Sequence, residues 1–154
     1  MSPTAVEVLL VDDNPSDAEL VLVTLASSAS HRVHHVHDGE EALDFLLCRA
    51  HYAERRFELL PRLVVLDLKL PKVNGLEVLR EIRADPRTRS IPVVLLTSSK
   101  MERDVAEGYR LGVNSYIQKP VDFEEFRETV KDIGRYWLQR NEPAPLPAVE
   151  PELV

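Results

Sequence analysis

The chain has 154 residues, enough for one domain with a short appendage, and 44% of them are hydrophobic, so it can build a core. Its formal net charge of −7 argues against nucleic acid as the main partner, because phosphate backbones are bound by clustered Lys and Arg. The single cysteine, Cys48, excludes an internal disulfide, and no apolar run is long enough to cross a bilayer. We therefore expect a cytoplasmic protein that binds neither nucleic acid nor membranes.

Short apolar runs alternate with helical patterns five times along the chain. The runs, which we predict to be strands, are residues 6–11, 32–37, 63–66, 92–96 and 115–117. The first, third and fourth are nearly continuous Val, Leu and Ile, as in strands buried on both faces of a parallel sheet. The second is polar and rich in histidine, which is typical of an edge strand.

Helix start signals stand between the runs. Asn14 precedes Pro15, a cap residue followed by proline at the first helical position. Four further segments resemble capping boxes, and they begin at Asp38, Asn74, Ser99 and Asp122. Gly112 is expected to end the fourth helix. Five strand–helix units predict a doubly wound α/β fold, with helices on both faces of a parallel sheet. The flavodoxin-like order 2-1-3-4-5 would leave the polar second strand on an edge.

Two segments lie outside this scheme. Residues 48–62 form a long charged connection that we expect to extend the second helix. Residues 141–154 hold four of the eleven prolines and no apolar period, so we predict a folded domain over 1–140 and a disordered proline-rich tail over 141–154.

Polar residues stand where the predicted strands end. Asp12 and Asp13 end the first strand, Asp67 the third and Thr97 the fourth, and Lys119 follows the fifth. Because open α/β sheets place ligand sites at the carboxyl ends of their strands, we expect these residues to converge.

Three carboxylates in one crevice repel each other and favour a cation. At a separation of roughly 4 Å and an effective dielectric constant of about 20, each pair repels by about 4 kcal/mol. Hard oxygen ligands with room for water and phosphate suit Mg²⁺. The metal and Lys119 would neutralise a phosphoryl group in transfer, and the Thr97 hydroxyl can donate to one of its oxygens. Asp12 and Asp13 are adjacent and suit a shared metal role, which leaves Asp67 as the nucleophile.

Four short motifs stand at these strand ends, and they are Asp12-Asp13, Asp67-Leu-Lys-Leu-Pro71 with Gly75, Leu96-Thr97-Ser98, and Tyr116 followed by Lys119-Pro120. In this order they resemble the receiver domain of two-component response regulators (CheY-like), over roughly residues 5–138. The resemblance implies that a sensor histidine kinase phosphorylates Asp67. It also implies that Asp12, Asp13, Asp67 and the backbone carbonyl of Lys69 hold Mg²⁺.

The same resemblance assigns the remaining site residues. Thr97 and Lys119 would contact the phosphoryl oxygens, and Tyr116 would act with Thr97 as a conformational switch. It also implies a cis bond between Lys119 and Pro120. Lys69 and Ser99 occupy positions that influence the lifetime of the phosphoryl group in this family.

The long connection, Thr97-Ser98-Ser99 and the missing output domain are similar to the stand-alone regulators paired with phytochrome kinases. Such a protein would signal through protein contacts, including a homodimer through the fourth helix, the fifth strand and the last helix. Leu20 and Val23 lie off the core stripe of the first helix, which in receivers docks on the kinase; a wider buried face is the alternative. Tyr136 and Leu138 lie off the stripe of the last helix and are candidate dimer contacts.

The sequence also bears on functions other than that of a phosphoacceptor. An aspartyl phosphatase of the haloacid dehalogenase type would have a second acid two residues after the nucleophile, where this chain has Lys69. A phosphorelay shuttle that passes its phosphoryl group to a second histidine protein, and a receiver-like scaffold that needs no phosphorylation, stay open. His35 and His37 would share a strand face, but no Cys or acid stands at ligand spacing for zinc, so a polar edge strand is the preferred interpretation.

Overall fold

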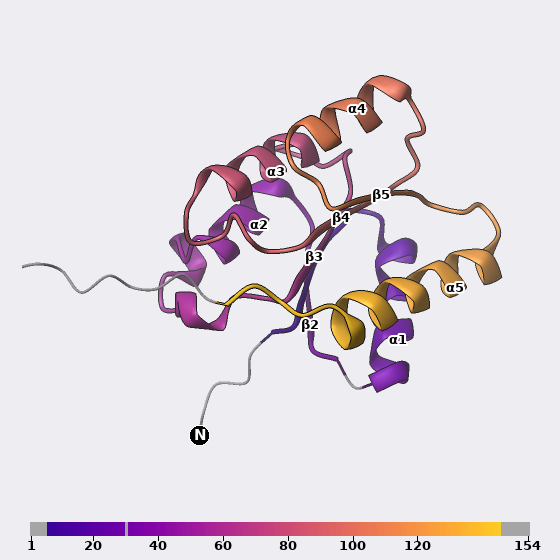
Figure 1. The fold of residues 1–154 in the computed structure, drawn as a ribbon, viewed down its shortest axis with the longest axis horizontal. Coiled ribbons are helices and arrows are strands. Elements are labelled where there is room, and N and C mark those ends of the chain that lie inside the picture. Colours follow the sequence, from indigo (N-terminus) through magenta and orange to yellow (C-terminus); the bar gives the residue numbers. More distant parts are fainter. Residues whose placement is uncertain (1–5, 30, 146–154) are drawn as a thin grey trace, which may run out of the picture.

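Five parallel strands form the central sheet of the computed structural model, which describes residues 6–29 and 31–145 (Figure 1). The strands are β1 (Val8–Val11), β2 (Val33–Val36), β3 (Leu63–Leu66), β4 (Val93–Thr97) and β5 (Ser115–Gln118). Their order is β2-β1-β3-β4-β5, which confirms the predicted topology and places the histidine-rich β2 on an edge. In the register of the sheet, Val8 of β1 lies between Val33 and Leu63.

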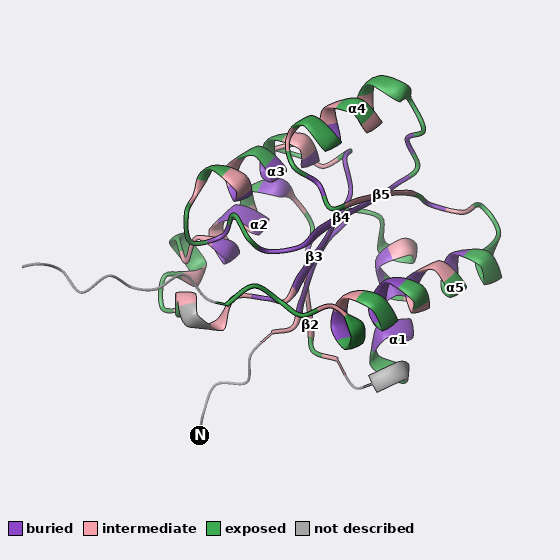
Figure 2. Ribbon diagram, viewed as in Figure 1, coloured by how far each residue is buried: buried purple, intermediate pink, exposed green. Residues whose placement is uncertain are grey.

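Helices cover both faces of this sheet. They are α1 (Pro15–Ala29), α2 (Gly39–Leu46), α3 (Gly75–Ala84), α4 (Glu102–Arg110) and α5 (Phe123–Gly134). Helices α1 and α5 pack on one face, and α2 and α3, with α4 beside them, on the other (Figure 1). The central strands β1, β3 and β4 are buried, the edge strands β2 and β5 are mostly half-buried, and the outward faces of the helices are exposed (Figure 2). Among the described residues, no helix has the length and apolarity that a membrane span requires.

Side-chain caps begin most of these helices, as the sequence predicts. The side chains that accept a backbone N–H from the first helical turn belong to Asn14, Asp38, Asn74 and Asp122. The predicted cap at Ser99 is wrong. Helix α4 begins at Glu102, and Met101 occupies the cap position. The Ser99 hydroxyl donates instead to Asp104 Oδ2 (2.6 Å).

The connection of residues 48–62 does not extend α2, contrary to expectation. Cys48 and Ala50 have positive φ angles of 53° and 49°, a left-handed conformation that a continuing α-helix cannot contain. Two short 3₁₀ turns, Ala50–Tyr52 and Phe57–Leu59, follow. The Arg55 guanidinium lies 3.5 Å from the centroid of the Phe45 ring and so fixes the connection to α2.

A π-helical turn, Arg135–Arg140, follows α5 and changes which side chains face the core. A π-turn holds more residues than an α-helical turn, so the 3.6-residue period no longer predicts the buried side. Leu138 is only 4% exposed and packs in the core between α1, α5 and the sheet. The prediction of Leu138 as a dimer contact is therefore wrong, whereas Tyr136 is 53% exposed.

The predicted tail is described only in part. Pro143, Ala144 and Pro145 lie beside Leu60 and Pro92, next to the amino ends of β3 and β4. Residues 146–154 lie outside the described residues, so the disordered tail and the boundary at residue 140 stay predictions.

Arg83 at the end of α3 ties two loops to the sheet. Its guanidinium donates to the carbonyl oxygens of Gly112, Arg89 and Ile91 and to Asn114 Oδ1, each at 2.8 Å. Burial lowers the pKa of Arg83 below its ordinary value. The contacts hold the turns that lead into β4 and β5, and so fix where those strands begin.

Candidate functional site

The carboxyl ends of β1, β3 and β5 bring Asp12, Asp67 and Lys119 to one point. The backbone N–H of Asp67 donates to Val11 O (3.0 Å), which places Asp67 beside the end of β1. The backbone N–H of Lys119 donates to Thr97 O (2.7 Å), which holds Lys119 at the end of β4. Parallel pairing therefore gathers side chains that are far apart in the sequence.

The Lys119 ammonium donates three hydrogen bonds to three carboxylates. Its acceptors are the Oδ2 atoms of Asp12 (2.9 Å), Asp17 (2.8 Å) and Asp67 (2.7 Å). An ammonium has three N–H donors, so all are engaged. Burial lowers the pKa of Lys119, but the hydrogen bonds to Asp17, Asp67 and Asp12 outweigh it and raise this pKa above its ordinary value. We call these four residues the strand-end site.

The strand-end site has more negative than positive charge. Three carboxylates face one ammonium, so two negative charges remain when all are ionised. Burial raises the pKa of Asp12 above its ordinary value, by more than the hydrogen bond from Lys119 lowers it. Asp13 is exposed beside Asp12 and adds one more carboxylate at the rim. The site therefore favours a further cation.

The donor chemistry fits a hard divalent cation. Asp12, Asp13 and Asp67 offer only carboxylate oxygens, the ligands that Mg²⁺ and Mn²⁺ prefer. Within the described ranges, no three His, Cys, Asp or Glu side chains are already arranged around one metal position. Lys119 lies between Asp12 and Asp67 instead, so a metal ion would compete with its ammonium for these carboxylates.

Asp17 was not predicted as a site residue. It lies in the first turn of α1, where Asn14 Oδ1 accepts the backbone N–H groups of Ser16 and Asp17, both at 3.0 Å. This cap directs the start of α1 toward the strand ends. The available signal was the acidic residue in the first turn of a helix that begins beside the site.

Thr97 and Tyr116 are joined through Ser99. Thr97 is fully buried at the end of β4, and its Oγ1 accepts a long hydrogen bond from the Ser99 N–H (3.4 Å). The Tyr116 hydroxyl donates to the Ser99 carbonyl (2.8 Å). Burial raises the pKa of Tyr116 above its ordinary value. A change at Thr97 thus has a short covalent and hydrogen-bonded route to β5.

The loop after Asp67 folds back over the strand end. The Lys69 N–H donates to Asp67 Oδ1 (3.4 Å), and the Gly75 N–H donates to Leu68 O (2.8 Å). A Cβ on Gly75 would lie 2.1 Å from the Asp67 carbonyl oxygen. Only glycine therefore allows α3 to start this close to Asp67.

A groove of about 380 Å³ leads to Lys119 from the side of α1 and α5. Asp17 and Lys119 line it together with Leu20, and Phe123 is a further wall residue that is exposed. No peptide bond is cis in the described chain, so the expected cis bond before Pro120 is not present. Lys119 reaches the acids with a trans bond.

The remaining predicted contact residues differ in exposure. Val23 is 61% exposed on α1, as expected. Leu20 is half-buried and packs against the core. It therefore fits the alternative of a wider buried face of α1 better than that of an exposed kinase contact. Tyr136 stands beside Trp137, with ring centroids 4.8 Å apart.

The histidines in β2 and just before it have structural partners. His34 Nε2 donates to the Tyr52 hydroxyl (2.9 Å), which donates to Glu41 (2.7 Å). His35 Nε2 donates to the backbone carbonyl of Asp12 (2.8 Å). His31 pairs with Glu7 (2.8 Å). In the part of the chain described here, these rings do not form a zinc cluster.

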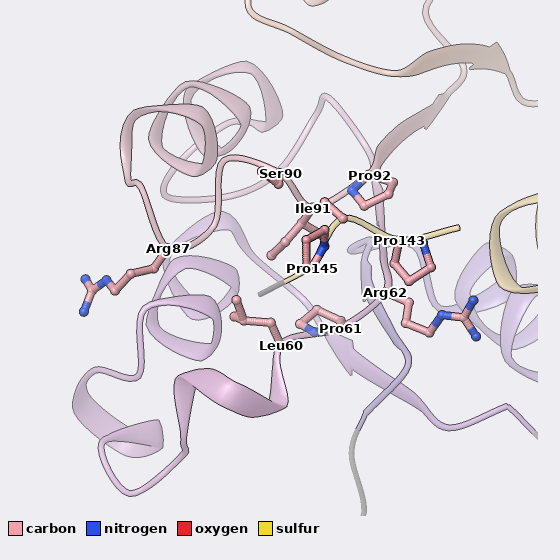
Figure 3. A pocket seen from close by; sticks show the side chains of 10 residues that line it. Leu60, Pro61, Arg62, Arg87, Ser90, Ile91, Pro92, Pro143 and Pro145 are labelled. Carbon is pink, nitrogen blue, oxygen red and sulfur yellow. The ribbon is translucent and has the colours of Figure 1, made fainter. Parts of the chain in front are cut away.

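A pocket of about 220 Å³ lies at the opposite edge of the sheet, where β3 and β4 begin (Figure 3). Leu60, Ile91 and Pro145 form an apolar wall, and Arg62 and Arg87 extend away from it (Figure 3). The Arg87 guanidinium donates two hydrogen bonds to Asp85. The pocket is separated from the strand-end site by the length of the strands.

Comparison with known proteins identifies one protein family that this chain resembles. A model of the response regulator receiver domain matches residues 8–131. The probable methanogenesis regulatory protein FilR2 of Methanothrix harundinacea is 44% identical over 135 residues, covering 87% of this chain and 84% of that protein. Response regulator Rcp1 of Synechocystis sp. is 39% identical over 133 residues, covering 86% of this chain and 88% of that protein.

Solved structures agree with these relatives. The phosphorylated cyanobacterial phytochrome response regulator RcpA is 40% identical with a TM-score of 0.83, covering 94% of this chain and all (100%) of that chain. The Mn²⁺-bound form of Rcp1 is 38% identical with a TM-score of 0.82, covering 92% and 98%. The bacteriophytochrome response regulator RtBRR is 48% identical with a TM-score of 0.71, covering 92% and 86%.

Proposed function

Because the chain belongs to the response regulator receiver domain family, we propose that Asp67 accepts a phosphoryl group from a phosphohistidine of a sensor kinase. The observation that carries this assignment is the hydrogen bond from buried Lys119 to Asp67 Oδ2 (2.7 Å). A carboxylate and a fixed cation therefore lie side by side at the carboxyl edge of the sheet, which supports Asp67 as the nucleophile.

The reaction forms one bond and breaks one. A carboxylate oxygen of Asp67 attacks phosphorus, the P–N bond breaks, and the electron pair stays on the leaving imidazole. Lys119 stabilises the negative charge on the phosphoryl oxygens, and the buried Thr97 hydroxyl donates to one of them. Mg²⁺ held by Asp12, Asp13, Asp67 and the Lys69 carbonyl would supply additional charge neutralisation.

Phosphorylation then favours a second conformation. The phosphoryl oxygens attract the Thr97 hydroxyl, and Thr97 is linked through Ser99 to Tyr116. Movement of these residues alters the surface formed by α4, β5 and α5. A homodimer through this surface, with Tyr136 at its margin, is one output.

The partner is inferred from the relatives. RcpA and RtBRR are described as phytochrome and bacteriophytochrome response regulators, so we propose a phytochrome-type histidine kinase acting in the cytoplasm. The kinase would contact exposed Val23 and the edge of Leu20 on α1. Passing the phosphoryl group on to a second histidine protein is the alternative output.

Intact mass after incubation with acetyl phosphate tests the proposal. One Mg²⁺-dependent phosphoryl adduct is expected on the wild-type chain and none on Asp67→Asn. Asp85→Asn is the matched control, because Asp85 follows α3 at the other edge of the sheet and pairs with Arg87. An adduct of equal size on Asp67→Asn would refute the assignment. If acetyl phosphate gives no adduct, transfer from a phosphorylated phytochrome kinase is measured, and its absence refutes the proposal.

A further inference from the structure

Asp17 is the partner of Lys119 that has no task in the proposed phosphotransfer. Asp12 and Asp67 share the same ammonium, but both are needed by the metal ion or the phosphoryl group. We propose that Asp17 is a positioning residue that holds the Lys119 ammonium when a divalent cation binds Asp12 and Asp67. This inference rests on the proposed function, because it explains how the same site accommodates two cations.

Competition at the carboxylates makes such a residue necessary. Lys119 engages Oδ2 of Asp12, and Oδ1 of Asp12 already accepts the Asn14 N–H (2.9 Å). Lys119 also engages Oδ2 of Asp67. A metal ion that binds these carboxylates, at Asp67 through the Oδ1 that Lys119 does not use, neutralises part of their charge and so weakens their attraction for the ammonium. A buried ammonium without a partner is costly, so a third acceptor lowers the cost of admitting the metal.

The position of Asp17 suits this role. Its Oδ2 lies 2.8 Å from the Lys119 Nζ, on the side of α1 rather than at a strand end. The Asn14 cap fixes its backbone. Its side chain is 28% exposed and lines the groove beside Lys119, whereas Asp12 and Asp67 are buried. The ammonium can therefore shift toward Asp17 without leaving the site.

Calorimetric titration of the unphosphorylated chain with Mg²⁺ measures the Mg²⁺ affinity and tests the inference. Asp17→Asn should weaken Mg²⁺ binding about threefold to tenfold, the range between an exposed ion pair and a charged hydrogen bond. Glu19→Gln is the matched control, because Glu19 is an exposed acid on the same helix; it should change the affinity by less than about twofold. Equal affinities for Asp17→Asn and the wild type would overturn the inference.

Removing Lys119 separates positioning from simple charge. In a Lys119→Met background, Asp17→Asn should have no further effect on Mg²⁺ affinity, because the residue through which Asp17 acts is gone. The same loss in both backgrounds would overturn the positioning role. If Lys119→Met does not fold, Asp17→Glu replaces it: this variant keeps an acceptor for the ammonium and should recover most of the affinity, and no recovery would overturn the inference.

The outcome for the wild type distinguishes the two proposals. A wild-type chain that does not bind Mg²⁺ and accepts a phosphoryl group neither from acetyl phosphate nor from the phosphorylated kinase would refute the proposed function and this inference together. A wild-type chain that does both, with Asp17→Asn unchanged, would refute this inference alone.

Discussion

Replacing Gly75 with alanine should displace Asp67 and destabilise the fold. The new Cβ would lie 2.1 Å from the Asp67 carbonyl oxygen and 2.8 Å from Leu68 Cα, both backbone atoms. Relief requires the start of α3 to move by about 1 Å, because carbon and oxygen do not approach this closely. Such overpacking costs about 1–3 kcal/mol, and weakening the Gly75 N–H···Leu68 O hydrogen bond costs about 1 kcal/mol more. Alanine recovers about 0.5–1 kcal/mol through its lower conformational entropy in the unfolded chain. The net loss is about 2 kcal/mol.

Urea unfolding measures this loss, with Gly134→Ala as the control. A Cβ on Gly134 would meet only Leu25 Cδ2 (2.8 Å), the end of a flexible side chain. The control should therefore stay within about 1 kcal/mol of the wild type. Labelling of Gly75→Ala by acetyl phosphate, measured where the variant is folded, should slow by about tenfold to a hundredfold, since a displacement of about 1 Å misaligns the nucleophile. Equal stabilities of the two variants would refute the close contact between α3 and Asp67.

Three further changes test other parts of the structure. Arg83→Met should lower the free energy of unfolding by about 2 kcal/mol in urea titrations, because four acceptors on two loops lose their donor; a loss below 0.5 kcal/mol, on the order of an ordinary surface substitution, would contradict this. Leu138→Ala should lower the free energy of unfolding by about 2–3 kcal/mol, and Tyr136→Ala should lower it by less than about 0.5 kcal/mol. The reverse order would contradict the π-turn and favour a continuous α-helix. Burial lowers the pKa of His34 from its ordinary value of 6.5, so the unfolded chain takes up a proton there at higher pH than the folded chain does. The free energy of unfolding should therefore decrease as the pH is lowered below about 6.5. Urea unfolding between about pH 7.5 and pH 5.5 should show a smaller decrease for His34→Gln than for the wild type. Equal decreases would argue against the burial of His34.

Much of the fold could be predicted because hydrophobic periodicity reports burial. Continuous Val and Leu in β1, β3 and β4 requires cover on both faces, and the polar β2 requires an edge. Helix caps at Asp38 and Asn74 were visible as local patterns, since their acceptors lie three residues from their donors. The strand order and the convergence of strand-end residues follow from these local facts and the handedness of crossovers.

The missed features depend on contacts or backbone states that periodicity does not report. Cys48 and Ala50 are ordinary residues in helices, but their left-handed conformations end α2. Leu138 faces the core only because a π-turn changes the phase after Gly134. Asp17 has the sequence signature of a helix start, and its contact with Lys119 spans 102 residues. Each depends on tertiary packing rather than on local pattern.

The charge of the strand-end site connects its stability to its proposed chemistry. In the unphosphorylated chain, Lys119 is surrounded by acceptors and prevents the direct repulsion of Asp12 and Asp67. In the proposed reaction, the product on Asp67 carries more negative charge than the carboxylate it replaces, because a phosphoryl group has a charge of about −1.5 to −2 at neutral pH. Lys119 already faces three acids, so its single charge cannot compensate for this increase as well. The phosphorylated state must therefore draw on the metal ion and on neutral donors such as Thr97. Under this proposal, the hydroxyl buried at the end of β4 meets that demand, and the hydrogen bonds of Ser99 connect it to Tyr116.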